Sequence, residues 1–201
     1  MTCLPTVLQT TILCKSTSSL TASQAAIARV FSFGAAVSSS PSISIPPTVI
    51  VVHPRERRSK CSVEPLRLRQ EFIFTTYPNP APVDLSRYVR LGIGGPVIGP
   101  QDADRGLLLL DGTWRWAAKM ENAYQAMTVR SLPSIRTAYP RKSEVFEDPA
   151  DGLATIEALY AALRLLGRET AGLLDQYHWK NQFLELNGWS EGSISRLEQP
   201  N

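Results

Sequence analysis

The sequence predicts an α/β fold, a single domain built on a mostly parallel sheet. Short apolar runs rich in Val, Ile and Leu, typical of strands buried on both faces, alternate with segments whose apolar residues recur every three or four positions, as in helices. Such alternation is typical of parallel sheets covered by helices. With 201 residues, 43% of them hydrophobic, the chain can build one domain with a substantial core but not two large domains.

Residues 1–46 differ in composition from the rest of the chain. They are rich in Ser, Thr and Ala, contain no acidic residue, and carry only Lys15 and Arg29 as charged residues. This composition is typical of a disordered extension, and also of an organelle-targeting segment. We expect a disordered or targeting-like extension over 1–46, a folded domain over 47–190 and a flexible tail over 191–201. A cytoplasmic location is expected, with organelle targeting left open.

The first predicted strand is Thr48–Val52, a β-branched apolar run at which the composition changes abruptly. A basic loop, residues 53–62, follows it. Glu71–Thr75 is the second predicted strand, bounded by a cluster of prolines. Residues 84–104 are predicted to be mostly loop because glycines and prolines recur through them.

A third predicted strand, Gly106–Leu110, runs directly into Asp111. Open α/β folds place their sites at the carboxyl ends of buried strands, so Asp111 is a candidate site residue. A helix is predicted from Trp114 to about Met127, with Asp111 or Thr113 able to cap its start.

The last third of the sequence predicts one strand and two helices. Ser134–Tyr139 is a predicted strand, stopped by Pro140. The strongest helical periodicity covers about residues 152–166 and ends at Gly167, a natural C-terminal stop. A second helix is predicted over much of residues 169–186.

Cysteine and histidine usage argues against disulfides and metal. The three cysteines, Cys3, Cys14 and Cys61, form no CxxC pair, and the two histidines, His53 and His178, lie at no metal-site spacing from them or from each other. No apolar run approaches the roughly 20 residues needed to span a bilayer. We therefore expect no metal and no membrane partner.

Three segments of the sequence, taken in order, are similar to the motifs of one known protein family. Leu108–Trp114 ends in Asp-Gly-Thr-Trp, similar to a strand followed by Asp-Cys-Ser-Trp; residues 132–140 hold Leu-Pro and Ala-Tyr-Pro, similar to Leu-Pro and Ala-Asn-Pro. Leu153–Ala158 together with residues 177–187 is similar to a Leu-Ser-Thr-x-Glu-Ala helix and a Phe-Lys-Trp-Gly-x-x-Phe-x-x-x-Asn ending. In this order they resemble the 18S rRNA aminocarboxypropyltransferases, a SPOUT-like group related to the DTW-domain tRNA-uridine aminocarboxypropyltransferases.

The sequence departs from this family in two places. The stretch from Pro54 to Ser62 is similar to the family's Asp-Pro-Lys-x-Cys-Thr loop, but it has extra residues and His53 stands where the aspartate is expected. Gly112 and Thr113 replace Cys-Ser, a variant that leans toward the DTW relatives. These departures leave the RNA target open.

The resemblance implies an enzyme, an S-adenosylmethionine-dependent RNA aminocarboxypropyltransferase (EC 2.5.1.-). It would move the 3-amino-3-carboxypropyl group onto a uridine or pseudouridine base of small-subunit rRNA during ribosome biogenesis. S-adenosylmethionine is a sulfonium whose carbons are already activated, so the reaction needs no metal. The resemblance also implies a SPOUT-like fold with a knotted C-terminal half, and we expect a monomer.

The resemblance assigns roles to particular residues. Asp111 would orient or deprotonate the uridine N3–H, or bind the amino group of the donor, and Trp114 would face the sulfonium. The remaining donor-binding residues are Ser62 for the methionine part, Leu110 and Leu132 for the adenosine, Thr155 to close the pocket, and Asp151. Four of these residues have a plain structural alternative: helix capping for Asp111, and core packing for Trp114, Leu110 and Leu132.

The net charge of +3 permits an RNA partner without establishing one. Six basic residues of the front segment are the candidate phosphate contacts, with a solvated basic face as the alternative: Arg55, Arg57, Arg58, Lys60, Arg67 and Arg69. Three other functions stay open. They are the same transfer onto tRNA uridine, an RNA methyltransferase that uses the same donor, and a non-catalytic rRNA-binding assembly factor.

Overall fold

The computed structural model describes residues 44–140 and 152–190. Its centre is a five-stranded sheet in which every pairing is parallel, with strand order β2-β1-β4-β3-β5. The strands are β1 (Thr48–Val52), β2 (Phe72–Thr76), β3 (Tyr88–Leu91), β4 (Gly106–Asp111) and β5 (Val129–Arg130). The predicted α/β class and parallel sheet are confirmed.

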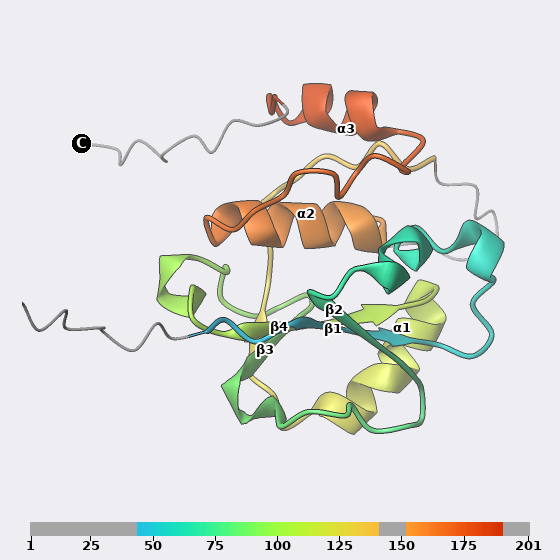
Figure 1. Cartoon of the computed structure of the whole chain (residues 1–201), viewed down its shortest axis with the longest axis vertical. Helices are drawn as coiled ribbons and strands as arrows, with labels where there is room; N and C mark the ends of the chain where they lie inside the picture. Colours follow the sequence, from blue (N-terminus) through green and yellow to red (C-terminus); the bar gives the residue numbers. More distant parts are fainter. Residues whose placement is uncertain (1–43, 141–151, 191–201) are drawn as a thin grey trace, which may run out of the picture. The chain divides into compact units, whose positions relative to one another are not determined.

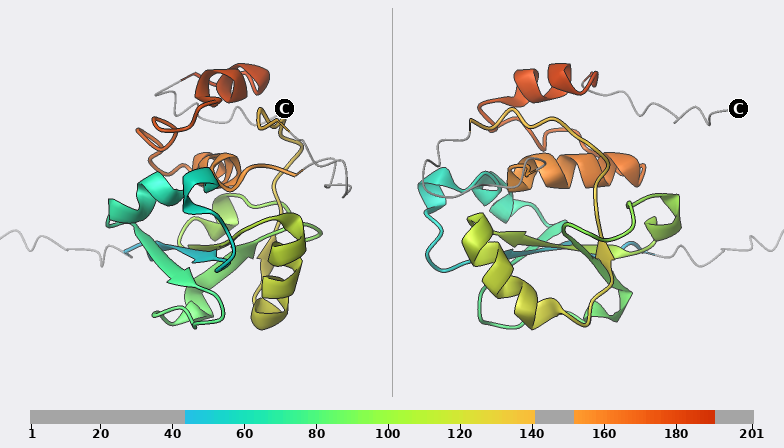
Figure 2. Two further views of the ribbon diagram at one scale, coloured as in Figure 1. Left: turned by 90° about the vertical axis from the view of Figure 1, so that its right-hand side faces the viewer. Right: turned by 180° about the vertical axis from the view of Figure 1, so that it is seen from behind.

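Helices cover both faces of the sheet (Figures 1 and 2). The helix α1 (Trp114–Glu121), continued by the 3-10 turn η5 (Asn122–Tyr124), lies below the sheet in Figure 1. Above it lie α2 (Thr155–Leu165) and the 3-10 turns η1 (Arg58–Lys60) and η2 (Glu64–Leu68). The short helix α3 (Lys180–Leu186) lies above α2. Two further 3-10 turns, η3 (Leu85–Arg87) and η4 (Pro100–Asp102), flank β3.

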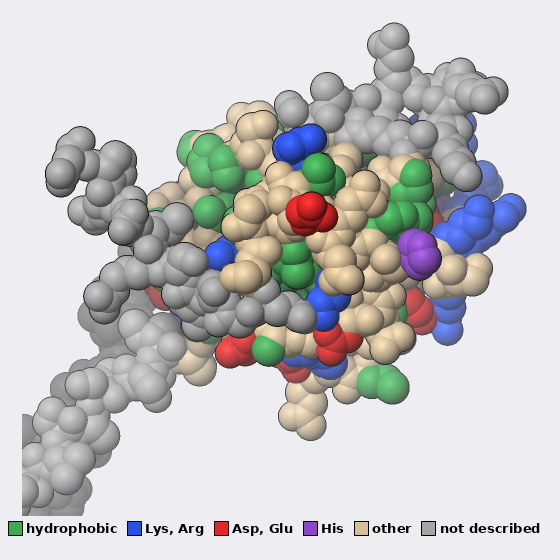
Figure 3. Space-filling model, turned by 90° about the horizontal axis from the view of Figure 1, so that it is seen from above, with side chains coloured by type: hydrophobic (Ala, Val, Ile, Leu, Met, Phe, Trp, Pro, Cys, Tyr) green, Lys and Arg blue, Asp and Glu red, His purple; other side chains and the backbone are tan. Residues whose placement is uncertain are grey.

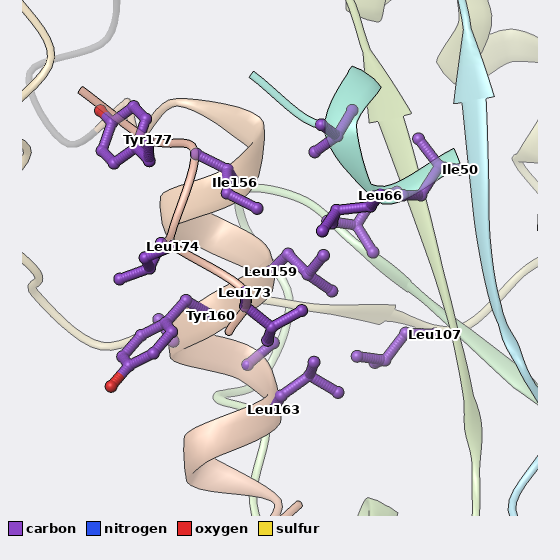
Figure 4. Close-up of a cluster of buried hydrophobic side chains, with 14 of the residues drawn as sticks. Ile50, Leu66, Leu107, Ile156, Leu159, Tyr160, Leu163, Leu173, Leu174 and Tyr177 are labelled. Carbon is purple, nitrogen blue, oxygen red and sulfur yellow. The ribbon is translucent and has the colours of Figure 1, made fainter. Parts of the chain in front are cut away.

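The main core lies between the sheet and α2, and Figure 4 shows part of it. Ile50 and Leu107 of β1 and β4 point toward Ile156 and Leu159 of α2, and all four are without exposed surface. The outer side of α2 is also buried, because Tyr160 meets the ring of Phe183 from α3 at 6.1 Å between centroids. A smaller cluster under the sheet packs against α1. Its buried members are Val49, Val51, Tyr88, Leu108, Met120 and Tyr124.

Three predicted elements match the structure closely. Thr48–Val52 is β1 as predicted, Glu71–Thr75 is β2 displaced by one residue, and Gly106–Leu110 is β4 with Asp111 added to its end. The helix predicted from residue 152 is α2, which begins at Thr155. The helix predicted to reach Met127 ends at Glu121 and continues as the single turn η5.

Two short strands were not predicted. β3 lies in the stretch predicted to be loop, and its Arg90 interrupts the apolar pattern. The Arg90 side chain is buried under the sheet and donates to Glu121 of α1 at 2.7 Å, so the charge is paired inside the fold. β5 has only two residues, too few to give a periodic signal.

The strand predicted over Ser134–Tyr139 is wrong, because side chains bind this segment's backbone in place of a neighbouring strand. Arg136 exchanges two backbone hydrogen bonds with the Asn187 side chain, and the Ala138 N–H donates to Glu157 at 2.8 Å. The segment crosses from β5 to the level of α3 (Figure 1).

The helix predicted from Glu169 is wrong over its first half. The Glu169 carboxylate accepts the backbone N–H groups of Thr170 and Ala171, and Gly172 adopts a φ of 70°, so residues 169–179 form turns. Only Lys180–Leu186 is helical. Within the described residues, no helix is long and apolar enough to cross a membrane.

Candidate active site

The sheet has a switch point between its two central strands. The chain leaves β1 over the α2 face, through η1 and η2, and leaves β4 under the opposite face, through α1. The two connections therefore diverge at the carboxyl ends of adjacent parallel strands, where open α/β sheets form their ligand crevices. Asp111, the last residue of β4, lies at this point opposite Val52 of β1.

The Asp111 side chain points to the α2 face, as alternation along β4 from Leu107 and Leu109 requires. It is 4% exposed. The Cys61 thiol donates to Asp111 Oδ2 at 3.0 Å, and the Thr155 hydroxyl at the start of α2 is a second hydrogen-bond partner. Three segments distant in sequence thus meet at one carboxylate.

Burial sets the protonation behaviour of this pair. It raises the pKa of the Asp111 carboxyl, and the nearby Glu64 charge acts in the same direction, whereas the hydrogen bonds from Cys61 and Thr155 lower it. Burial, followed by the Asp111 charge and hydrogen bond, raises the pKa of the Cys61 thiol to about 12. Cys61 is therefore a protonated hydrogen-bond donor and not a thiolate nucleophile.

Trp114 opens α1 beside the start of α2. Its indole is 36% exposed, and a Cβ added to Gly152 would come within 2.6 Å of the ring atom Cζ2. The absence of a side chain at Gly152 therefore lets the indole lie against the backbone that leads into α2. A partly exposed aromatic face near the start of α2, where Thr155 bonds Asp111, is suited to a cationic, partly apolar ligand.

Ser62 lies next to Cys61 and caps α2 from outside the helix. Its Oγ accepts the backbone N–H of Ile156 at 3.2 Å, one of the amide groups that have no partner within the helix. Residue 154 is an alanine with no side-chain acceptor, so Ser62 supplies what a local cap would have supplied. The loop after β1 and the start of α2 are held together through this bond.

The other predicted donor-binding residues are distributed over both faces of the sheet. Leu110 packs with the cluster on the α1 face, whereas Leu132 packs against the main core on the α2 face. Their side chains therefore belong to different sides of the sheet, and only backbone contacts could bring both to one ligand. Asp151 lies outside the described residues.

An aromatic stack under the site was not predicted. The buried His53 ring stacks between Trp116, at 4.4 Å between centroids, and Tyr77, at 6.0 Å, and its Nδ1 accepts the Arg55 backbone N–H at 3.2 Å. A Cβ added to Gly112 would lie 3.3 Å from His53 Cβ and 3.4 Å from Trp116 Cβ. The two departures from the family pattern, at positions 53 and 112, are thus in contact.

A second missed feature is the network around Glu157, whose side chain has no exposed surface. Its two oxygens accept four donors: the Thr137 hydroxyl at 2.6 Å, the Ala138 N–H at 2.8 Å, the Ala154 N–H at 3.0 Å and the Tyr177 hydroxyl at 3.0 Å. Glu157 fixes the start of α2 to the segment after β5. The sequence signal was the Glu of the matched helix motif, quoted above without a role.

The six candidate RNA contacts fall into two groups. Arg55, Arg57, Arg58 and Lys60 have exposed side chains in the loop after β1. Figure 3 shows Lys and Arg side chains gathered along the edge at which η1 lies in Figure 1. The other two, Arg67 and Arg69, contact acidic and aromatic side chains. Arg67 pairs with Glu64 at 2.9 Å and lies over the Phe74 ring.

Arg69 resembles Arg67 in this respect. Its guanidinium forms an ion pair with Glu71 at 2.5 Å and lies 5.7 Å from the centre of the Phe72 ring. Arg58 is intermediate, with an 80% exposed side chain 3.8 Å from Glu64. The positive charge that stays unbalanced is therefore on the first part of the loop.

Among solved structures, the chain is similar to the SAM-dependent rRNA:acp-transferase Tsr3 from Vulcanisaeta distributa. The similarity has a TM-score of 0.54 at 24% sequence identity and covers 72% of this chain and 80% of that chain. The two proteins share a fold. No protein-family profile and no curated protein matches the sequence.

Four of the predicted residues come from four different segments of this fold. Asp111, Ser62, Trp114 and Thr155 come together at the switch point, from β4, the loop after β1, α1 and α2. Among the described residues, no group of three or more His, Cys, Asp or Glu side chains is placed to hold a metal ion. The site is therefore built from one buried acid, neutral hydroxyl and thiol donors, and an indole.

Proposed function

We propose that this chain transfers the 3-amino-3-carboxypropyl group of S-adenosylmethionine to a uridine or pseudouridine base of small-subunit rRNA. The observation that carries the proposal is the position of Asp111 and Trp114. A buried acid and a partly exposed indole occupy the switch point of a fold shared with an SAM-dependent rRNA:acp-transferase. Ligands of open α/β folds bind at such points.

The residues around Trp114 fit the donor. S-adenosylmethionine would supply a carbon already activated by its sulfonium, and the indole offers both apolar contact and a cation–π attraction of about 0.5 to 2 kcal/mol to that charge. Thr155 at the start of α2 bonds Asp111, and Ser62 of the loop after β1 bonds the N–H of Ile156 in the same first turn of α2. Leu110 and Leu132 would contact the adenosine through backbone groups.

Asp111 has the capacity to bind a further donor. A carboxylate offers about four acceptor positions, and Cys61 and Thr155 occupy two of them. An N–H of the acceptor base or the amino group of the donor could take a third. With its pKa raised by burial, the carboxylate is a better proton acceptor than an exposed aspartate, which suits the removal of the uridine N3 proton.

Several finer properties are part of the same proposal. They are a SPOUT-like fold with a knotted C-terminal half, a monomer in a cytoplasmic location, and a reaction without a metal. The crossing of residues 131–140 to the level of α3, where Asn187 binds the backbone of Arg136, is the feature that supports a threaded C-terminal half. It would be one of the rare exceptions to unknotted chain connections.

The test uses S-adenosylmethionine labelled either in its carboxyl carbon or in its methyl group, incubated with the purified chain and with small-subunit rRNA or tRNA. Carboxyl label in the rRNA alone supports the proposal. Methyl label alone would identify a methyltransferase. Label in neither RNA, together with retained RNA binding, would identify a non-catalytic rRNA-binding factor.

A tRNA acceptor is the alternative favoured by Gly112 and Thr113. The packing around Gly112 offers a different reason for the glycine, since a larger residue would meet the Cβ atoms of His53 and Trp116. The close packing of the backbone against residues 53 and 116 therefore favours a glycine here, whichever RNA is bound. Carboxyl label in tRNA alone would establish the alternative.

A further inference from the structure

Three cationic side chains converge on Trp116, under the sheet. The Arg55 guanidinium lies 5.3 Å, the Arg115 guanidinium 4.5 Å and the Lys119 ammonium 4.7 Å from the centre of the indole ring. Arg55 comes from the loop after β1, and the other two from α1. We call Arg55, Trp116 and Lys119 the Trp116 cluster.

The charges of this cluster are not balanced by acids in the described part of the chain. Neither Arg55 nor Lys119 forms an ion pair there, in contrast to Arg67 and Arg69, which do. The nearest acid along the loop, Glu56, interacts with the backbone of Arg57 and Thr113. Cations gathered around one ring repel one another, and a bound anion would reduce that repulsion.

The cluster is directly joined to the active site. Gly112, the residue after Asp111, lies against Trp116 Cβ and against His53, which stacks on the same indole. Trp114 and Trp116 lie two residues apart in the first turn of α1, one toward Gly152 and one toward His53. The cluster is therefore joined to the end of β4 through Gly112 and His53, while Trp114 projects from another side of the same helical turn.

The depth of Asp111 constrains the acceptor. Only 4% of Asp111 is exposed, so a base that reaches it must enter the crevice and leave any helix in which it is paired. The strand at the mouth of the crevice is then single, and its phosphates lie on either side of the inserted base. Lys and Arg that neutralise such phosphates supply most of the sequence-independent affinity for RNA.

We propose that the Trp116 cluster binds a backbone phosphate of the unpaired RNA strand that carries the acceptor base. The identity of the anion as RNA rests on the proposed function. The RNA then runs across the loop after β1 toward α1, and away from Arg67 and Arg69 of η2 and its flank. Lys119 is thereby added to the predicted RNA contacts, and Arg67 and Arg69 are removed from them.

The test measures binding of a fluorescein-labelled 20-nucleotide single-stranded oligouridine to the full chain at several salt concentrations. Each phosphate contact in a single strand contributes about 0.7 to the slope of log affinity against log salt. Lys119→Gln and Arg55→Gln are each expected to lower the slope by about that amount, which corresponds to a roughly fourfold loss of affinity near 0.15 M salt. Lys119→Arg keeps the charge and should keep the slope.

Arg87→Gln is the matched control, because Arg87 is an exposed arginine in the turn before β3, at the opposite, amino edge of the sheet. It should leave the slope unchanged. Circular dichroism melting of each variant shows whether it is folded, and Lys119→Arg reports on the charge if Lys119→Gln does not fold. Equal slopes for wild type, Lys119→Gln and Arg55→Gln, or a wild-type chain that does not bind the oligouridine, would overturn the proposal.

The outcome is independent of the labelled-donor experiment. If Lys119→Gln lowers the slope while no carboxyl label reaches any RNA, the cluster is an RNA-binding surface and the proposed transfer is wrong. If carboxyl label is transferred with equal rates and equal slopes in wild type and Lys119→Gln, the transfer stands and the cluster has no role in RNA binding.

Discussion

Trp114 is the residue on which the donor-binding part of the proposal depends most directly. Its indole is partly exposed and packs against Gly152. Replacing it with alanine should weaken S-adenosylmethionine binding about 2- to 30-fold, the equivalent of a cation–π interaction of about 0.5 to 2 kcal/mol. Isothermal titration calorimetry measures this directly.

The comparison variant is Trp114→Phe, which keeps an aromatic face and should lose less affinity than Trp114→Ala. Leu68→Ala removes a side chain that is 95% exposed on η2 and should have no effect on binding. Unchanged affinity in Trp114→Ala would show that the donor does not face this indole.

His53 gives the stability of the protein a dependence on pH. Burial, followed by the Arg55 and Lys119 charges, lowers the pKa of His53 below its ordinary value of 6.5. The folded state then binds fewer protons than the unfolded chain between the lowered value and 6.5, so stability rises with pH through this interval and is complete above it. Acidification protonates the ring, removes the acceptor of the Arg55 N–H and destabilises the fold.

His53→Phe should keep the stack on Trp116 and lose this pH dependence. The free energy of unfolding in urea, measured from about pH 5 to about pH 7.5, should rise with pH more steeply in wild type than in the variant. Parallel curves for the two proteins would show that His53 does not titrate differently on folding.

At the scale of elements, Glu157 connects α2 to the segment after β5 and to the turn that contains Tyr177. Because all four of its acceptor positions are used, an amide in its place leaves donors facing donors. Glu157→Gln should lower the free energy of unfolding by about 1 to 3 kcal/mol for each buried group left without a partner. Chemical denaturation followed by circular dichroism measures the loss.

Glu185→Gln is the control for this prediction, since Glu185 lies on the exposed side of α3. It should change stability by less than about 0.5 kcal/mol. Equal stability of the two variants would mean that the network rearranges to satisfy an amide.

The same network explains what the sequence could and could not predict about elements. β1 and β4 were predictable because both of their faces are buried, which gives unbroken apolar runs, and α2 because its apolar residues recur at helical spacing. Residues 134–139 carry the pattern of a strand, but their hydrogen bonds go to Glu157 and Asn187, which are distant in sequence. No local pattern contains that information.

The candidate site shows a similar division. Asp111 was predictable from its place after a buried strand, and Trp114 and Thr155 from their motifs. The stack of His53 on Trp116 was not, because it joins the loop after β1 to α1, which are distant in sequence. The ion pairs of Arg67 and Arg69 could not be predicted either, since a sequence gives the number of charges but not their partners.

At the scale of the whole molecule, the sheet and α2 share one core, which predicts a single cooperative unfolding transition. Leu159 is fully buried between α2 and the sheet, so Leu159→Ala should lower the global free energy of unfolding by about 2 to 5 kcal/mol. Leu68→Ala, at an exposed position, should change it by less than about 0.5 kcal/mol. Urea titrations of the three proteins test this, and a loss in Leu68→Ala as large as in Leu159→Ala would contradict it.

The strand order has a consequence for synthesis in the cell. β1 ends at Val52, yet its central partner β4 begins at Gly106, and α2, which covers one face of both, begins only at Thr155. During translation the two central strands pair late, and their upper face stays uncovered until α2 leaves the ribosome. Pairings this distant in sequence form slowly. We therefore expect the yield of folded protein to depend on elongation rate and chaperone supply while that apolar face is open.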